Sequence, residues 1–510
     1  MPPPLETGQI TALANGLLGD LQSTGEVPAD SLDQLCTLAT ADDPAVARAG
    51  SRALFRNIVE PLGDSFDPVM ADLYVRFFSG VIDDCRRRPS FRAFDRQLDE
   101  FGLKTKQQLI ERAARIRMAK EHTPNVVFGR MAETSEVRHP LPPSNAVVKR
   151  MKTIFVPSRV TLGADIAVTS VILSRMKTLF PNARIALLGS AKAGSLFASD
   201  SRVELVETAY PRGGTLRERL DAWVSLCQRV AEQLDGMRPD EYMIVDPDSR
   251  LTQLGLLPLE SDDSRYYHFD SRSYSLAEEQ PLALLTGCWL DEALGPERIM
   301  TRQAIRRTPP PGSEWGYNPE YPYVALPLED LERGRALKAK ARGPLAAVNL
   351  GVGGNDEKRV DDPFELETLM VLLKSGYTLV LDRGAGEEEL ERTGRLLAIL
   401  RGQDKTVSEA PLPGSDVPAA DVFAWEGSLS GFGGLIASAD IYCGYDSAGG
   451  HLAAALGVPV IDIFTDASAP RLIERWTPWG EGPVQIITAR RSQPRIAIGQ
   501  FGRALREQAR

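Results

Sequence analysis

The residues best suited to bind an anion lie between Asp440 and Phe464, in DIYCGYDSAGGHLAAALGVPVIDIF. An apolar run leads into a short glycine-containing turn, and a helical pattern follows until Gly457. The N-terminus of a helix offers unpaired backbone N–H groups and the positive end of the helix dipole, which suit a pyrophosphate. Glycines let the backbone approach a ligand closely, although many strand–turn–helix units only pack. The candidate ligand-binding residues are Asp446, Ser447, Ala448, Gly449, Gly450 and His451.

A second glycine-rich segment, NLGVGGNDEKRV, runs from Asn349 to Val360. A strand pattern ends among its glycines, and the loop after them carries a lysine. Lysine acts on phosphate as a compact point charge, and consecutive backbone N–H groups can form a concave anion site. The segment therefore predicts an anion-binding loop, and the alternative is a surface loop whose basic residues are incidental. Its candidate residues are Gly351, Gly353, Gly354 and Lys358.

A candidate general base, Asp165, lies in SRVTLGADIAVT, the segment from Ser158 to Thr169. A strand pattern ends in a loop that holds Gly163 and Asp165, directly before a helical pattern. An aspartate in that position is usually an N-cap, and the residues alone favour this role. The position also permits general base catalysis, which needs a carboxylate within hydrogen-bond reach of an acceptor hydroxyl.

Short apolar strands that alternate with helical patterns must position these residues. The first series of expected strands is Thr153 to Pro157, Arg184 to Gly189, Val203 to Glu207 and Tyr242 to Asp246. The second series is Ala346 to Leu350, Thr378 to Asp382, Val422 to Trp425, Asp440 to Gly444 and Val460 to Phe464. The helical patterns between them include Ile166 to Leu179, Pro363 to Lys374, Glu387 to Leu400 and Leu429 to Ser438. Such alternation predicts parallel sheets covered on both faces.

The predicted fold class is α/β, with two Rossmann-like domains facing a cleft in a GT-B-like arrangement and an all-helical domain before them. Ligands in such sheets bind beyond the carboxyl ends of the strands. The last helix, near Ile498 to Gln508, is expected to pack close to the interdomain region. The predicted segments are a helical domain (1–125), a linker rich in proline and polar residues (126–150), the first Rossmann-like domain (151–335), the second (336–495) and a C-terminal helix (496–510).

Composition narrows the function classes. A net charge of -10 argues against a dedicated nucleic-acid binder, which would show a basic footprint. Five scattered cysteines and four histidines lack metal-ligand spacing, and sparse cysteine fits a reducing compartment. The N-terminal MPPPLETGQI lacks the basic and apolar regions of a signal peptide, and no apolar run reaches membrane-spanning length. We expect a cytoplasmic protein without a transmembrane segment, whose membrane contact would be peripheral, at the inner face of the membrane.

Together, these three segments resemble the ADP-heptose:lipopolysaccharide heptosyltransferases, glycosyltransferase family 9. The resemblance runs from about residue 151 to about residue 490 and leaves the first 150 residues outside it. KTIFVPSRVTLGADIAVTSVILSRMKTLFPNARIALLGS is similar to the start of the family, and DSAGGHLAAALGVPVIDIF is similar to its Asp-Ser/Thr-Gly-x-x-His-x-x-Ala-Ala-Leu signature. The resemblance implies that residues 151–335 form the acceptor domain and residues 336–495 form the nucleotide-sugar domain.

The resemblance also implies roles for single residues. The family's catalytic aspartate matches Asp165 if Ala164 is an insertion, whereas a gapless match puts Ala164 there and leaves no base. Lys358 falls on the lysine that binds the donor's phosphate, and Glu388 in DRGAGEE falls on the glutamate that meets the donor nucleoside. Ala448 stands where the family usually has glycine, which leaves the sugar and nucleotide preference open.

The leading hypothesis is an inverting glycosyltransferase that uses neither a metal nor a cofactor. Asp165 would deprotonate a hydroxyl acceptor, while Lys358 and the amides after Asp446 would stabilise the departing diphosphate. The family default is heptose from a nucleotide-diphosphate donor, with a lipopolysaccharide-like glycan or a protein as acceptor. The alternative is a non-catalytic nucleotide-sugar-binding or scaffold protein of the same fold. The helical domain could bind an acceptor, a partner or a second copy of the chain.

Overall fold

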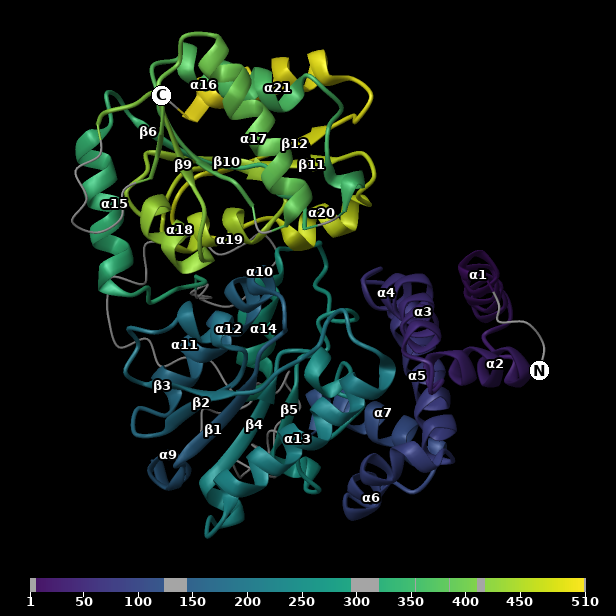
Figure 1. Cartoon of the computed structure of the whole chain (residues 1–510). Helices are drawn as coiled ribbons and strands as arrows, with labels where there is room; N and C mark the ends of the chain where they lie inside the picture. The colour runs from purple at the N-terminus through teal and green to yellow at the C-terminus, as the bar shows by residue number, and fades with distance from the viewer. Residues whose placement is uncertain are drawn as a thin grey trace.

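The helices that open the chain pack alongside the first of two parallel β-sheets (Figure 1). The computed structural model describes residues 6–122, 145–294, 321–353, 355–384, 386–410 and 418–508. The opening helices are α1 (Thr7–Thr24), α2 (Ala29–Ala39), α3 (Pro44–Leu54), α4 (Glu60–Gly63), α5 (Pro68–Arg86), α6 (Arg92–Glu100) and α7 (Lys106–His122), with a π-helical turn at Phe55–Val59 and a 3-10 turn at Pro89–Phe91.

Local sequence signals determine where these helices begin and how closely they pack. The carboxylate of Asp43 accepts hydrogen bonds from the backbone N–H groups of Ala45 and Val46, so it caps α3 as expected. Thr105 and Gln108 form the expected capping box before α7. At Gly50, a Cβ atom would lie 2.5 Å from the backbone of α2, so only glycine allows α2 and α3 to approach this closely.

The first sheet has the strand order β3-β2-β1-β4-β5, and every neighbouring pair is parallel. Its four predicted strands are confirmed, and one short strand was not expected. The strands are β1 (Thr153–Pro157), β2 (Arg184–Gly189), β3 (Val203–Glu207), β4 (Tyr242–Asp246) and the unexpected β5 (Tyr266–His268). The helices are α9 (Asn145–Arg150), α10 (Leu162–Ala164), α11 (Ser170–Leu179), α12 (Ala191–Ser195), α13 (Leu216–Leu234) and α14 (Leu282–Leu294), joined by short 3-10 turns.

Two predictions near this sheet need correction. The helix predicted from Ile166 begins as a π-helical turn, Asp165–Thr169, and becomes α-helical only at Ser170. The last residues of the predicted linker, 145–150, form α9, and the part up to residue 144 lies outside the described residues.

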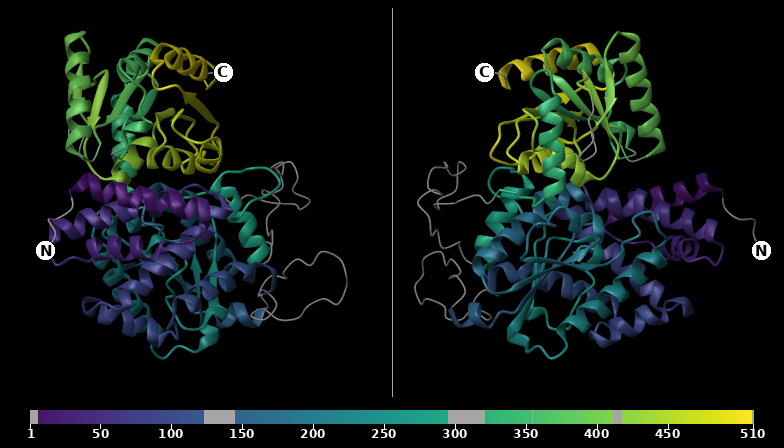
Figure 2. Two further views of the ribbon diagram at one scale, coloured as in Figure 1. Left: turned by 90° about the vertical axis from the view of Figure 1, so that its right-hand side faces the viewer. Right: turned by 60° about the vertical axis from the view of Figure 1, so that its left-hand side comes forward.

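The opening helices share their hydrophobic core with the first sheet. Trp223 of α13 packs edge-on against Phe94 and Phe101, with ring centroids 5.3 and 6.0 Å apart. Arg112 of α7 donates to Asp263 at 2.8 Å and to the carbonyl of Gly255 at 2.6 Å. Both views in Figure 2 show the helices alongside the domain of the first sheet. Much of the apolar surface of these helices is therefore buried within the chain.

The second sheet has the order β12-β11-β10-β6-β7-β9-β8 and is also entirely parallel. Its strands are β6 (Leu345–Asn349), β7 (Thr378–Asp382), β8 (Val407–Glu409), β9 (Val422–Trp425), β10 (Ile441–Tyr445), β11 (Val460–Thr465) and β12 (Val484–Ala489). Sequence patterns predicted five of these strands, to within one residue at each end, and missed β8 and β12. Its helices are α15 (Leu328–Lys340), α16 (Phe364–Lys374), α17 (Glu387–Gly402), α18 (Leu429–Ile436), α19 (Ala448–Ala455), α20 (Pro470–Trp476) and α21 (Pro494–Gln508).

The last helix does not lie where the sequence suggested. α21 packs against α16, β11 and β12, and its buried residues Ala497, Phe501 and Leu505 join the core on that face of the second sheet. Figure 1 shows it on the side of the second domain away from the first. The prediction that this helix packs near the interdomain region is therefore wrong, because its apolar residues face the adjacent sheet.

The two sheets face each other through the carboxyl ends of their strands. α10, which follows β1, packs against α19, which follows β10 (Figure 1). A Cβ atom added to Gly163 would lie 3.3 Å from both the Cα atom of Ala448 and the ring of His451. These contacts confirm the predicted GT-B-like arrangement. Within the described ranges, no helix combines the length and apolar character that crossing a membrane requires.

Candidate functional site

Each sheet has a switch point, a position between two adjacent strands from which the chain continues toward opposite edges of the sheet. In the second sheet it lies between β6 and β10, and in the first sheet between β1 and β4. Ligands of open parallel sheets bind in the crevice beyond the strands at such a switch point. The structure places the loops that follow β1 and β10 against each other, so both switch points border one interdomain junction.

Lys358 joins the two loops that flank the second switch point. Its ammonium nitrogen lies 2.5 Å from Oδ2 of Asp446 and 3.3 Å from the backbone oxygen of the same residue. The loop is fixed on β11 by the hydroxyl of Thr465, which donates to the carbonyl of Glu357 at 2.6 Å. The Lys358 side chain is still 32% exposed, so its charge is accessible to a ligand that enters between β6 and β10.

The N-terminus of α19 has no side-chain cap. Ser447 is its N-cap residue, but its hydroxyl lies 3.4 Å from the hydroxyl of Tyr442 instead of accepting from the helix amides. The first N–H groups of a helix have no partner within the helix. They can therefore bind an anion beside Lys358, as the sequence predicted for this turn.

The glycines of this turn have a packing role that the sequence did not indicate. A Cβ atom on Gly449 would overlap the hydroxyl of Tyr442, and one on Gly450 would lie 3.3 Å from Oδ1 of Asp462. Asp462 is buried and neither carboxylate oxygen has a hydrogen-bond partner among the described residues. Burial and the nearby Asp446 raise the pKa of Asp462, which favours its neutral form. Both glycines thus let α19 lie directly over buried polar side chains.

His451 is buried at the junction. Its ring packs edge-on against Trp476, with centroids 5.7 Å apart. Burial and the nearby Lys358 lower the pKa of His451 to about 4, although Asp446 opposes the shift. At neutral pH the imidazole is therefore uncharged, and it can serve as a hydrogen-bond donor without adding charge.

A glutamate next to the predicted one contacts the glycine-rich loop. Glu388 is exposed in the first turn of α17, whereas Oε1 of Glu389 accepts hydrogen bonds from the N–H groups of Val352 and Gly353, at 2.9 and 3.1 Å. The side chain of Glu389 also occupies the space that a Cβ atom on Gly351 or Gly384 would need. Gly354 lies outside the described residues. Sequence spacing missed Glu389 because three consecutive glutamates begin α17.

Asp165 lies beneath the junction and is completely buried. Its two oxygens accept hydrogen bonds from the hydroxyls of Ser158 and Thr169, at 2.6 and 2.8 Å, and from the backbone N–H of Arg159 at 2.7 Å. Burial raises the pKa of the Asp165 carboxyl, against the effect of these hydrogen bonds. The side chain therefore fixes the loop after β1 onto the following helix, through hydrogen bonds that all lie within the segment from Ser158 to Thr169.

A comparison with protein-family models finds a match within the second domain. Residues 367–500 match the family model "Glycosyltransferase family 9 (heptosyltransferase)", which confirms over this segment the resemblance seen in the sequence. No curated protein matches the chain. Of the sequence candidates, the structure brings Lys358, Asp446 and His451 together at the end of the second sheet.

Solved structures with a similar course of the chain include three bacterial proteins. The glycosyl transferase family 9 protein from Veillonella parvula is 14% identical with a TM-score of 0.47, covering 70% of this chain and 89% of that one. E. coli ADP-heptose lps heptosyltransferase II is 17% identical with a TM-score of 0.45, covering 71% and 100%. E. coli heptosyltransferase WaaC with ADP is 17% identical with a TM-score of 0.45, covering 70% and 99%.

Proposed function

We propose that this chain is a glycosyltransferase that binds a nucleoside-diphosphate sugar at the second switch point and transfers the sugar to a hydroxyl group. The match of residues 367–500 to glycosyltransferase family 9 supports sugar transfer from a nucleotide sugar. The observation that carries the proposal is the position of Lys358, partly exposed between β6 and β10 beside the uncapped N-terminus of α19. A cation and a helix N-terminus together suit a diphosphate.

In this proposal the second domain stabilises the leaving group. As the glycosidic bond to the donor breaks, negative charge grows on the departing diphosphate. Lys358 would exchange Asp446 for the diphosphate, and the first amides of α19 would donate to its oxygens. Ser447, Ala448, Gly449, Gly450 and the neutral His451 border the same place, and Gly351 and Gly353 form its other wall. We favour Glu389 over Glu388 as the residue that shapes the nucleoside side, because Glu389 accepts hydrogen bonds from the loop after β6 and Glu388 is exposed.

On the acceptor side of the reaction, two roles for Asp165 compete. As a general base, its carboxylate would have to leave Ser158 and the N–H of Arg159 when the acceptor binds. As a positioning residue, it would keep these hydrogen bonds and hold the loop after β1 in place. We propose that Asp165 is the general base of an inverting transfer. To act as the base, its carboxylate must first give up the hydrogen bonds from Ser158 and from the N–H of Arg159.

One observation favours a second candidate function, a nucleotide-sugar-binding protein without turnover. Asp165, the carboxylate that the sequence nominates as the base, is completely buried. Hydrolysis and transfer of the donor, measured with and without acceptor, separate the two functions. A protein that binds nucleotide sugars tightly but never consumes them would support the second candidate.

A thermal-shift screen of nucleoside diphosphates and nucleotide sugars tests the proposed function. A ligand that binds the native state raises the melting temperature by mass action. We expect a shift with at least one diphosphate nucleotide, and ADP-heptose is the first donor to test because heptose transfer defines the matched family. No shift with any nucleoside diphosphate would contradict the proposal. A lipopolysaccharide-like glycan or protein acceptor, metal independence and a cytoplasmic location stay predictions.

A further inference from the structure

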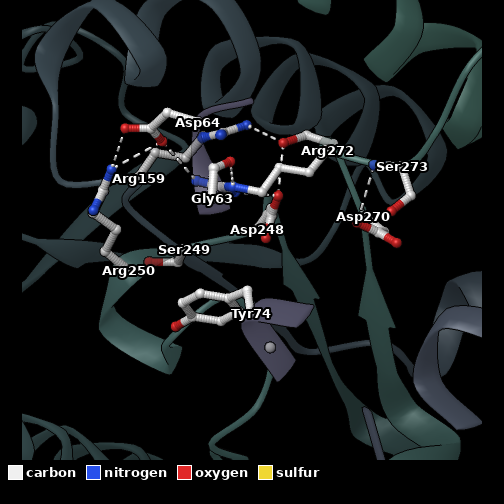
Figure 3. A network of polar contacts seen from close by, with 12 residues as sticks. Gly63, Asp64, Tyr74, Arg159, Asp248, Ser249, Arg250, Asp270, Arg272 and Ser273 are labelled. Carbon is white, nitrogen blue, oxygen red and sulfur yellow. Dashed lines mark hydrogen bonds and ion pairs between the residues drawn. The ribbon is translucent and has the colours of Figure 1, made fainter. Parts of the chain in front are cut away.

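Three arginines gather at the carboxyl end of the first sheet, beside its switch point. Arg159 follows β1, Arg250 follows β4 and Arg272 follows β5 (Figure 3). We call these three residues the arginine cluster. Arg159 and Arg272 are buried, and the side chain of Arg250 is 17% exposed. The motifs discussed above assign no role to the three guanidinium groups.

The cluster is closed by a residue from the opening helices. Asp64, at the end of α4, accepts from Nη2 of Arg250, which lies 3.1 and 3.0 Å from its two oxygens, and from Arg272 at 3.4 Å. Arg272 also donates to the carbonyl of Gly63. The Asp64 side chain is 45% exposed, so the place it occupies is open to solvent on one side. Figure 3 shows this carboxylate between the guanidinium groups.

The three guanidinium groups of the arginine cluster carry more positive charge than the two carboxylates that pair with them can neutralise. Asp248 pairs with Arg272 and accepts from the Ser271 hydroxyl at 2.7 Å. The guanidinium of Arg159 donates to that same hydroxyl at 3.0 Å, and within the described residues it forms no ion pair with a carboxylate. Three guanidinium groups thus share two carboxylates. Burial, together with the adjacent Arg272 and Arg250, lowers the pKa of Arg159 to about 10, although Asp248 opposes the shift.

The geometry of the Asp64 contact is also incomplete. One nitrogen of Arg250 serves both carboxylate oxygens, whereas the strongest arginine–carboxylate pairs use two parallel N–H donors. A phosphate has more acceptor oxygens than a carboxylate, and a free ligand could turn to use the whole fork. The contact between Arg250 and Asp64 therefore lacks the parallel pair of N–H donors.

The turn that carries Asp64 also reaches the second domain. Phe66 is buried with a φ of 54°, a left-handed conformation that is a genuine outlier for a bulky residue. Its ring packs edge-on against Trp476, with centroids 6.1 Å apart, and the Arg475 guanidinium lies 5.8 Å from the ring. Trp476 in turn packs against His451. One turn of the opening helices thus contacts both domains at their junction.

We propose that the arginine cluster is a subsite for an anionic group of the acceptor, a phosphate or a carboxylate, and that Asp64 occupies it until the acceptor binds. The inference rests on the proposed function, because it assumes that an acceptor enters at this junction. It also puts one arginine of the subsite on the same loop as the candidate base, since the backbone N–H of Arg159 donates to Asp165. The opening helices then act as an intramolecular cover of the acceptor side.

Calorimetric titration of the full chain with inorganic phosphate tests this subsite. All proteins carry Lys358→Ala, so that phosphate at the loop after β6 does not contribute. Asp64→Asn should bind phosphate at least about tenfold more tightly than Asp72→Asn, a matched control whose exposed aspartate pairs with Arg76. Adding Arg250→Gln should abolish the gain. A folded Asp64→Asn protein that binds phosphate no more tightly than the control would overturn the proposal.

A parallel titration with glucuronate distinguishes the two sources of the anion. Tighter binding of glucuronate identifies a sugar carboxylate, and tighter binding of phosphate identifies a phosphate group. Binding of neither anion by Asp64→Asn contradicts the subsite.

Hydrogen exchange provides a second measurement if Asp64→Asn fails to fold. In the wild-type chain, phosphate should speed the exchange of residues 60–67 by displacing Asp64, and Arg250→Gln should remove this effect. Unchanged exchange in the wild type would overturn the proposal. Titration of the wild-type chain, with Lys358 intact, with ADP separates the two ideas. Normal ADP binding without a phosphate site rejects only the subsite, whereas a phosphate site without ADP binding rejects the proposed function and with it the acceptor role of the cluster.

Discussion

The ammonium group of Lys358 lies 2.5 Å from the carboxylate of Asp446, and this ion pair spans the loops that follow β6 and β10. In this ion pair each residue neutralises the charge of the other. A diphosphate that takes Lys358 from Asp446 would replace one carboxylate partner by a more highly charged one. The pair therefore holds the cation at the switch point without leaving it unpaired.

Glu389 and Glu388 offer a matched pair of substitutions. Glu389→Gln should weaken nucleotide binding several-fold, because an amide oxygen accepts less strongly from the N–H groups of Val352 and Gly353 than a carboxylate does. Glu388→Gln should leave binding unchanged, since Glu388 is exposed. Calorimetry with ADP, GDP and UDP measures both. Loss of affinity in Glu388→Gln but not in Glu389→Gln would instead support Glu388, the glutamate that the sequence assigned to the donor nucleoside.

Asp165→Asn tests the two roles of this buried carboxylate. All three of its partners are donors, and asparagine has one acceptor oxygen, so we expect a loss of about 1–3 kcal/mol in unfolding free energy. If Asp165 is also the base, transfer should fall by about 10²–10⁴-fold while donor affinity persists. Ser158→Ala is the control, because it removes the hydroxyl that donates to Asp165 and accepts from the N–H of Val160, and it keeps the carboxylate. Equal loss of transfer in both variants would indicate a positioning role.

His451 makes the stability of the chain depend on pH. Its pKa in the folded protein, about 4, lies below the ordinary value of 6.5, so the unfolded chain binds a proton more readily. The stability that His451 contributes is therefore present above pH 6.5 and is lost as the pH falls toward 4. The difference in urea-unfolding free energy between wild type and His451→Gln should shrink over this window. A difference that is constant from pH 7.5 to about 4.5 would contradict the burial of a neutral imidazole.

Gly449 and Tyr442 should show coupled stability effects. Gly449→Ala is expected to destabilise the protein, because the new methyl group would overlap the Tyr442 hydroxyl. Tyr442→Phe removes that hydroxyl, after which the nearest ring atom lies 2.9 Å from the methyl position. The double variant should therefore recover part of the loss. Additive effects in a double-mutant cycle would show that the contact does not limit this glycine.

The alternation of apolar strands and helical patterns was sufficient to predict both parallel sheets. Strands such as β1 and β7 are buried along nearly their whole length, which gives continuous apolar runs. The strands β5 and β8 escaped because each has three residues, too few to establish a pattern. The packing of α21 could not be read from its own sequence, because an amphipathic helix does not specify which apolar surface it covers.

The candidate site was only partly predictable, because some of its contacts join residues that lie far apart in the sequence. Lys358 and Asp446 were found because each follows a strand and lies in a glycine-containing turn. The contact between Asp64 and Arg250 joins residues 186 positions apart, and neither lies in a recognisable motif. Local sequence also could not choose between capping and catalysis for Asp165. Its carboxylate instead binds residues on both sides of it in the chain, Ser158 and Thr169.

The most direct test of the central claim is the affinity of Lys358→Ala for nucleoside diphosphates, measured by calorimetry beside the exposed control Lys374→Ala. Removing the lysine deletes a charge-assisted contact and leaves Asp446 facing the diphosphate, so we expect a loss of about 1–3 kcal/mol in binding free energy. The control should bind as the wild type does. Equal affinity of Lys358→Ala and wild type for ADP, GDP and UDP would contradict a donor site at this switch point.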